Sequence, residues 1–174
     1  MRPPARSTSI RRGPADVTDP QERLSAMGMP LPPVPLPVAS YVPFVRTGPL
    51  VFTAGQVPRR DGAIITGVVG SSIDPSAARD AAAIAAVQAI AAVKEAAGDL
   101  RLVRRIVKAT VFVSSAPDFH GQSSVADGAS ELLEAAFGSH GKHARSAVGV
   151  AALPGGACVE VELIAEIGEP QSAS

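Results

Sequence analysis

Arg145 and Glu160 stand among small and apolar residues in the segment KHARSAVGVAALPGGACVEVELIAE, at 142–166. Arg145 opens the first β-rich run of this segment, and Glu160 lies inside the second. A guanidinium can bind a carboxylate with two parallel hydrogen bonds, and a glutamate can position or deprotonate water. The pair predicts a site in which Arg145 binds the carboxylate of a small molecule and Glu160 takes part in the chemistry. The alternative is that both are ordinary charges on a solvated sheet face.

The two runs are expected to pair as a hairpin through the LPGG turn at 153–156. Side chains alternate along a strand, so every second residue from Val159 to Ala165 should face the core. Glu160 belongs to the other set and points away from the core. Pairing across this turn then predicts Arg145 on the same outward face as Glu160, about 13 Å further along the strands.

Three neighbouring side chains have open roles. His143 shares the strand parity of Arg145, so it is either a second donor in the cleft or a residue of its rim. Cys158 shares the face of Glu160, but the sequence offers it no activating partner, and we expect a buried, inert thiol rather than a nucleophile. Tyr41 either packs in the core or contacts the substrate.

Other β-rich runs predict the strands that accompany this pair. Residues 41–55 divide at Thr47-Gly48-Pro49 into two runs, which predicts a hairpin. Residues 56–74 carry scattered glycines and predict a loop. The β-branched run at 106–115 predicts a further strand.

Capping signals predict the helices. The segment 19–28 should form a short helix on the outside of the domain. Asp74 and Pro75 begin a long alanine-rich helix that should end at Gly98. An amphipathic pattern predicts another helix at 125–138.

The main domain therefore has the order β-β-α-β-α-β-β, which predicts an α+β fold, a single sheet with two helices on one face. A bare sheet face that is not polar favours a partner, so we expect an oligomer. We expect a disordered tail at 1–18, a short helix and proline-rich arm at 19–37, the domain at 38–168 and a second tail at 169–174.

Composition excludes several classes of function. The 16 basic and 16 acidic residues balance, which argues against nucleic acid and against anionic membrane surfaces as partners. The apolar segment 81–93 is too short to span a bilayer and contains Gln88. A single cysteine and the absence of zinc-site spacing predict a reducing, cytoplasmic location and no metal.

The segments RSAVGVAALPGGACVEVELIAE and YVPFVRTGPLVFTAGQVP resemble the RidA family, also called YjgF or L-PSP endoribonuclease, over roughly 38–167. The resemblance implies a chorismate-mutase-like fold and a homotrimeric barrel with clefts between subunits. It also implies hydrolysis of reactive 2-imino or enamino acids to 2-keto acids and ammonia, without a cofactor. These imino and keto acids would be the small-molecule partners.

The resemblance also assigns roles by position. Arg145 matches the carboxylate-binding arginine, Glu160 the water-positioning glutamate, and Tyr41 and Gly55 two further substrate contacts. Two positions depart from the family pattern. Ala54 stands where the family has a serine, and an asparagine common in the family falls near Pro117, so the substrate is left open.

Two other classes of function stay open. A non-catalytic trimer could hold small carboxylates in the same clefts as a binding or regulatory protein. A ribonuclease is suggested only by the older name of the family, and the neutral charge and scarcity of aromatic residues argue against it.

Overall fold

The computed structural model describes residues 19–34 and 40–168. The tails expected at 1–18 and 169–174 lie outside the described residues, as do residues 35–39. The elements are α1 (Pro20–Ala26), β1 (Phe44–Thr47), β2 (Leu50–Thr53), β3 (Arg59–Arg60), β4 (Ala63–Ile64), α2 (Pro75–Ala97), η1 (Leu100–Leu102), β5 (Val103–Ser114), α3 (Gln122–Phe137), η2 (Gly138–Gly141), β6 (Ala144–Val150), η3 (Pro154–Gly156) and β7 (Val159–Ile167).

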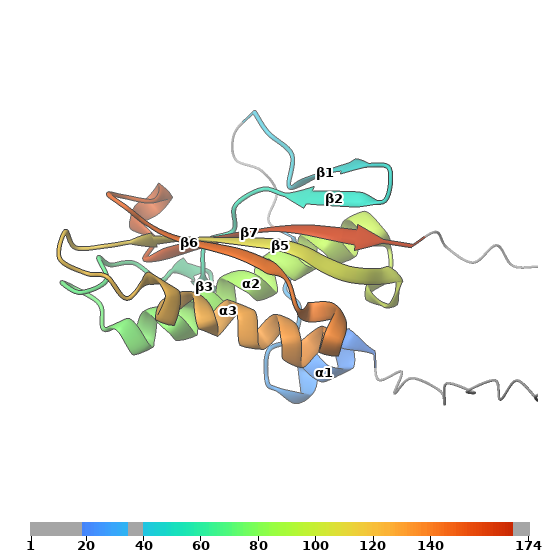
Figure 1. Ribbon diagram of the computed structural model, residues 1–174, viewed down its shortest axis with the longest axis horizontal. Helices are drawn as coiled ribbons and strands as arrows, with labels where there is room; N and C mark the ends of the chain where they lie inside the picture. Colours follow the sequence, from blue (N-terminus) through green and yellow to red (C-terminus); the bar gives the residue numbers. More distant parts are fainter. Residues whose placement is uncertain (1–18, 35–39, 169–174) are drawn as a thin grey trace, which may run out of the picture.

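The main domain consists of one sheet with helices on a single side. Its five strands lie in the order β1-β2-β7-β5-β6, and α2 and α3 pack together on one side of it (Figure 1). This architecture confirms the predicted α+β class. The predicted loop at 56–74 also contains the small β3–β4 hairpin, which forms a second, two-stranded sheet.

The long helix α2 begins and ends as its sequence predicts. The Asp74 carboxylate accepts a hydrogen bond from the Ser76 backbone at 2.8 Å, and Gly98 ends the helix at a φ of 80°. By length and composition α2 could cross a membrane, but 67% of the apolar window is buried inside the fold. The helix is therefore the core helix of a soluble domain, and its alanines let it lie close to the sheet.

Close packing of α2 on α3 depends on Gly128. A Cβ atom at this position would lie 2.0 Å from the backbone oxygen of Arg79 on α2, which is far inside van der Waals contact. We expect Gly128→Ala to lower the free energy of unfolding by about 1–3 kcal/mol or more, because the two helices must separate. Helix propensity alone predicts a gain of roughly 0.5–1 kcal/mol, so urea unfolding curves decide the sign. A more stable variant would contradict the tight packing.

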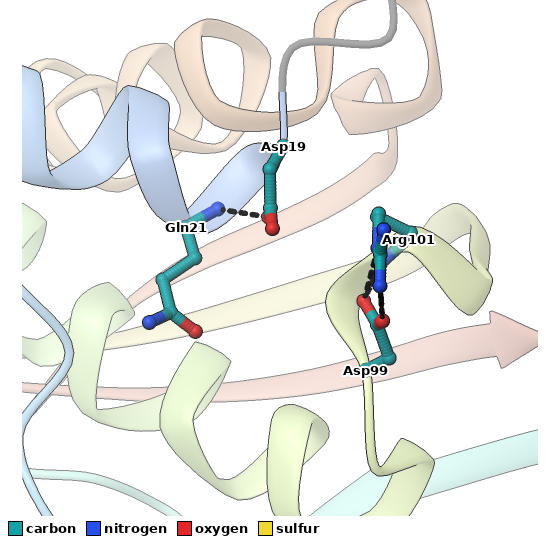
Figure 2. A network of polar contacts seen from close by, with 4 residues as sticks. All are labelled: Asp19, Gln21, Asp99 and Arg101. Carbon is teal, nitrogen blue, oxygen red and sulfur yellow. Dashed lines mark hydrogen bonds and ion pairs between the residues drawn. The ribbon is translucent and has the colours of Figure 1, made fainter.

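The short helix α1 packs against α3 and η1, on the outside of the domain as predicted. Leu24 is fully buried there. The carboxylate of Asp19 accepts a hydrogen bond from the Gln21 backbone at 2.9 Å and caps the helix (Figure 2). Arg101 bonds to Asp99 nearby, and this partner raises the pKa of Arg101, with a smaller contribution from the charge of Asp19. Charge complementarity therefore accompanies apolar packing where α1 meets η1.

The predicted hairpin between the last two strands is wrong. β6 runs parallel to β5, with Arg145 opposite Ala109, whereas β7 runs antiparallel on the other side of β5, with Glu160 opposite Phe112. The physical reason is that α3 carries the chain back to the start of the sheet, so that β6 can pair in parallel with β5. Residues 151–158 then cross the end of β5, so that β7 pairs with the other side of β5 in the centre of the sheet.

The sheet face that the helices leave uncovered is partly apolar. Phe52, which is 38% exposed, lies between Val45 and Ile164 of the neighbouring strands. Val148, which is 42% exposed, lies beside Phe112 of β5. Large apolar side chains side by side on an open sheet face are typical of a surface that another protein covers.

Candidate functional site

Arg145 points to the helix side of the sheet. Its strand partner Ala109 is fully buried under the helices, and its guanidinium reaches α3. Nη1 donates to the Asp127 carboxylate at 2.8 Å and to the Ser130 hydroxyl at 3.0 Å. The expectation that Arg145 shares the outward face of Glu160 is therefore wrong. That expectation followed from the wrong hairpin. Residues paired across neighbouring strands point to the same face, so the choice of neighbour decides which face of β6 points inward.

The same two hydrogen bonds leave one edge of the guanidinium available. They occupy both hydrogens of Nη1 and fix the plane of the group. Nε and Nη2 have no hydrogen-bond partner within the described residues, and the Arg145 side chain is 24% exposed. This Nε–Nη2 edge presents two parallel N–H groups, which is the arrangement that binds a carboxylate in a bidentate manner.

His143 supports the arginine through Ser130. His143 Nδ1 lies 2.6 Å from the carbonyl oxygen of Gly141, so this nitrogen carries a hydrogen. In the neutral ring, Nε2 then accepts from the Ser130 hydroxyl 3.1 Å away, and that hydroxyl accepts from Arg145. The structure thus links His143 to Arg145 through the single hydroxyl of Ser130.

A cavity of about 320 Å³ lies over this group. It is lined by Ser130, Glu134, Gly141, Lys142, His143 and Arg145. Lys142 forms an ion pair with Glu134 at 3.4 Å at the same place. The cavity is open to solvent, so a small anion can reach Arg145 through it.

Asp127 and Ser130, which anchor Arg145, were missed by the sequence reasoning. They lie three residues apart on α3, so they share one face of that helix. The sequence contained a signal that could have identified them. Because α3 connects β5 to β6, it must pass over both strands. A polar pair beside the apolar stripe of such a helix can meet a polar side chain of the strand below.

Glu160 points away from the helices, as predicted. Every second residue of β7 from Val159 to Ala165 is buried, and Glu160 belongs to the alternate set. Burial raises the pKa of the Glu160 carboxyl, and the negative charge of Glu162 on the same face raises it further. A carboxyl group with a raised pKa is better suited to accept a proton near neutral pH than an ordinary one.

Gly55 lies directly against the carboxylate of Glu160. A Cβ atom on Gly55 would stand 1.7 Å from Glu160 Oε1, so the contact exists only because the residue is glycine. The segment is held there by Gln56, whose backbone exchanges two hydrogen bonds with Val161 at 2.8 and 2.9 Å. The structure therefore brings Gly55 and Glu160 together, and Ala54 precedes them in the chain.

The remaining candidates take less part in this geometry. Tyr41 is 53% exposed before β1, which excludes the core-packing role within this chain. Cys158 is fully buried, and burial raises the pKa of its thiol, as expected for an inert cysteine. Among the described residues there is no cluster of His, Cys, Asp and Glu that could hold a metal ion.

Comparison with known proteins supplies the family. The family model described as endoribonuclease L-PSP matches residues 33–167. The chain belongs to this family, which is also called RidA/YjgF. Protein TCP17 of Trypanosoma cruzi is 43% identical over 146 residues, 83% of this chain and 91% of that protein.

Solved structures of similar proteins share the fold. The protein Atu1372 of Agrobacterium tumefaciens is 43% identical, with a TM-score of 0.81 over 86% of this chain and 92% of its own. TdcF of E. coli, solved with bound serine, is 28% identical, with a TM-score of 0.55 over 78% of this chain and 94% of its own. The expected family is therefore confirmed, and one structurally similar protein, TdcF, was solved with serine bound.

Within this RidA/YjgF chain the candidate residues form two separate halves. The first half is the anchored guanidinium of Arg145 on the helix side of β6, at the edge of the sheet. The second half is Glu160 with Gly55 on the open side of β7, a central strand. Because β5 and the thickness of the sheet lie between them, the two halves cannot act on one small molecule within a single chain.

Proposed function

We propose that the protein hydrolyses reactive 2-imino or enamino acids to 2-keto acids and ammonia, in the cytoplasm and without a cofactor. Arg145 binds the substrate carboxylate, and Glu160 directs water at the C=N carbon. The observation that carries this proposal is the guanidinium of Arg145, whose Nη1 is fixed by Asp127 and Ser130 while its Nε–Nη2 edge stays available. This arrangement prepares a bidentate carboxylate site before any substrate arrives.

The active site of this proposal is shared between copies of the chain. Arg145 and Glu160 lie on opposite faces of one sheet, so a site that uses both must take them from two copies. A homotrimer with clefts between subunits, as the family resemblance implies, provides that contact. The exposed apolar residues Val45, Phe52 and Val148 on the open face support such an assembly.

The chemistry needs only water and proton transfer. A water molecule attacks the C=N carbon of the protonated imine, while the carboxylate of Glu160 accepts one of its protons. The C–O bond forms as the C=N electron pair moves to nitrogen, which gives a carbinolamine. Glu160 returns the proton to this nitrogen, the C–N bond breaks as C=O forms, and the remaining hydroxyl proton passes to water. The products are one keto acid and one ammonia.

The direct test is an imine-hydrolysis assay over a panel of amino acids. An amino-acid oxidase generates the imines, and the appearance of keto acid and ammonia is followed with and without the purified protein. Acceleration by wild type supports the proposal. If keto acids bind by calorimetry while no imine disappears faster, the protein is instead a carboxylate-binding or regulatory member of the family, of the kind suggested by serine-bound TdcF.

Gly55→Ala tests the placement of Glu160 without removing its charge. The new Cβ would collide with the tip of the Glu160 side chain, which must swing away, while the backbone of Gly55 needs no positive φ. We expect a loss of kcat of about 100-fold or more, comparable to loss of a general base. Ala54→Ser, one residue earlier, is the matched control and should retain activity. Normal turnover by Gly55→Ala would contradict a role for Glu160 at this position.

A further inference from the structure

A second cavity, of about 480 Å³, shares no residue with either half of the proposed active site. It lies between the chain after α1, the β3–β4 hairpin and α2, and Figure 1 shows β3 beside α2. Its size falls within the range of about 300–1,000 Å³ that is usual for small-molecule sites. It is lined by Gly28, Met29, Pro30, Pro32, Arg59, Arg60, Asp61, Ile84, Val87 and Gln88.

Gln88 is the unusual member of this lining. This residue is only 6% exposed on an alanine-rich helix, and within the described residues its amide has no hydrogen-bond partner. No fully enclosed side-chain nitrogen or oxygen in the described part lacks a partner, so the amide of Gln88 must reach open space, which here is the cavity that it lines. Buried side-chain amides are normally hydrogen-bonded, so the amide of Gln88 offers an unused polar contact to a ligand in this cavity.

The rim of the cavity is positively charged. Asp61 and Gly62 have φ values of 52° and 81°, which form the tight two-residue turn of the β3–β4 hairpin. This turn holds Arg59 and Arg60 at the opening, and Arg59 donates from Nη1 to the Gly62 carbonyl at 3.4 Å. Two guanidinium groups against the single carboxylate of Asp61 favour an anionic ligand.

We infer that this cavity binds a small amphipathic carboxylate. The apolar body of the ligand lies between Met29 and Pro30 on one side and Ile84 and Val87 on the other. Its carboxylate faces Arg59 and Arg60 at the rim, and a second polar group, such as an amide, meets Gln88. This site is independent of imine hydrolysis, since it uses neither Arg145 nor Glu160.

Hippurate, which combines an aromatic ring, an amide and a carboxylate, is a suitable probe. In ¹⁵N–¹H spectra of the full chain, we expect hippurate to shift the amide signals of Met29, Arg60 and Gln88 in a saturable way. Hippuramide lacks the charge, and 4-phenylbutyrate lacks the amide. Each should bind at least about 10-fold more weakly than hippurate. Shifts confined to the region of Arg145, or no shift up to the solubility limit of hippurate, would overturn the assignment.

Two variants separate the carboxylate contact from the amide contact. Arg60→Ala should weaken hippurate about 10-fold, whereas Arg104→Ala, an exposed arginine of β5 outside the cavity, should not change it. Gln88→Leu should abolish the preference for hippurate over 4-phenylbutyrate and should melt at a higher temperature than wild type, because an unpartnered buried amide is replaced by hydrocarbon. A lower melting temperature would show that Gln88 is structural, and an unchanged preference would exclude it as the polar contact.

Discussion

Two inactive variants, Arg145→Ala and Glu160→Gln, should regain imine hydrolysis when their subunits are mixed in one assembly. Alone, Arg145→Ala loses a charge-assisted, bidentate contact. The loss of transition-state stabilisation is expected to be about 2–5 kcal/mol, which lowers kcat/KM roughly 30-fold to several thousand-fold. In a randomly mixed assembly whose sites take one residue from each of two copies, about one site in four holds both native residues. Activity should therefore recover to about a quarter of wild type.

The control for this experiment damages the same half of the site twice. Gly55 and Glu160 contact each other within one chain, so a mixture of Gly55→Ala with Glu160→Gln contains no intact Glu160 half. It should show no recovery, although its subunits exchange equally well. If the first mixture also stays inactive after mass spectrometry has shown mixed assemblies, then Arg145 and Glu160 do not meet across a subunit boundary, and the proposed site is wrong.

Arg145→Lys isolates the value of the guanidinium geometry. Lysine retains the positive charge but offers a single ammonium in place of two parallel N–H groups. Lysine also cannot bond to Asp127 and Ser130 with one group while presenting a second edge to the substrate. We therefore expect KM for the imine to rise markedly in this variant, as measured by the same coupled assay.

The main helices and strands of this fold could be predicted because they are encoded locally. Asp19 and Asp74 are capping residues that act within their own helices, and their hydrogen bonds are formed as expected. The alternation of apolar and polar side chains from Val159 to Ala165 indicates which face of β7 is buried, whichever strands lie beside it. Such signals do not depend on the neighbours that the chain acquires in the folded sheet.

The orientation of Arg145 could not be predicted in the same way. A short connection at 151–158 suggested that β6 and β7 are neighbours, but β5 lies between them. The parity of β6 is ambiguous in sequence because its side chains are small on both faces. Only its pairing with β5 and the contacts of Arg145 with Asp127 and Ser130 decide the matter, and these contacts join residues 15 or more positions apart.

Glu160→Gln should abolish most activity and yet stabilise the fold at neutral pH. Loss of the base is expected to lower kcat by about 100- to 10,000-fold. The same carboxylate is half-buried beside Glu162, so its ionised form is unfavourable in the folded state. Glutamine has nearly the same shape without the charge, and the variant should melt at a higher temperature than wild type.

The pH dependence of the stability gained in Glu160→Gln tests whether ionisation of Glu160 is its cause. Because the pKa of Glu160 is raised above the ordinary value of 4.5, the folded protein binds this proton more tightly than the unfolded chain. Wild type should therefore lose stability as pH rises from that value through the raised pKa, and the advantage of Glu160→Gln should grow over the same interval and vanish well below it. Glu166→Gln, which removes a charge six residues further along β7, is the control and should keep its activity. An advantage that is constant with pH would mean that the buried charge is not its source.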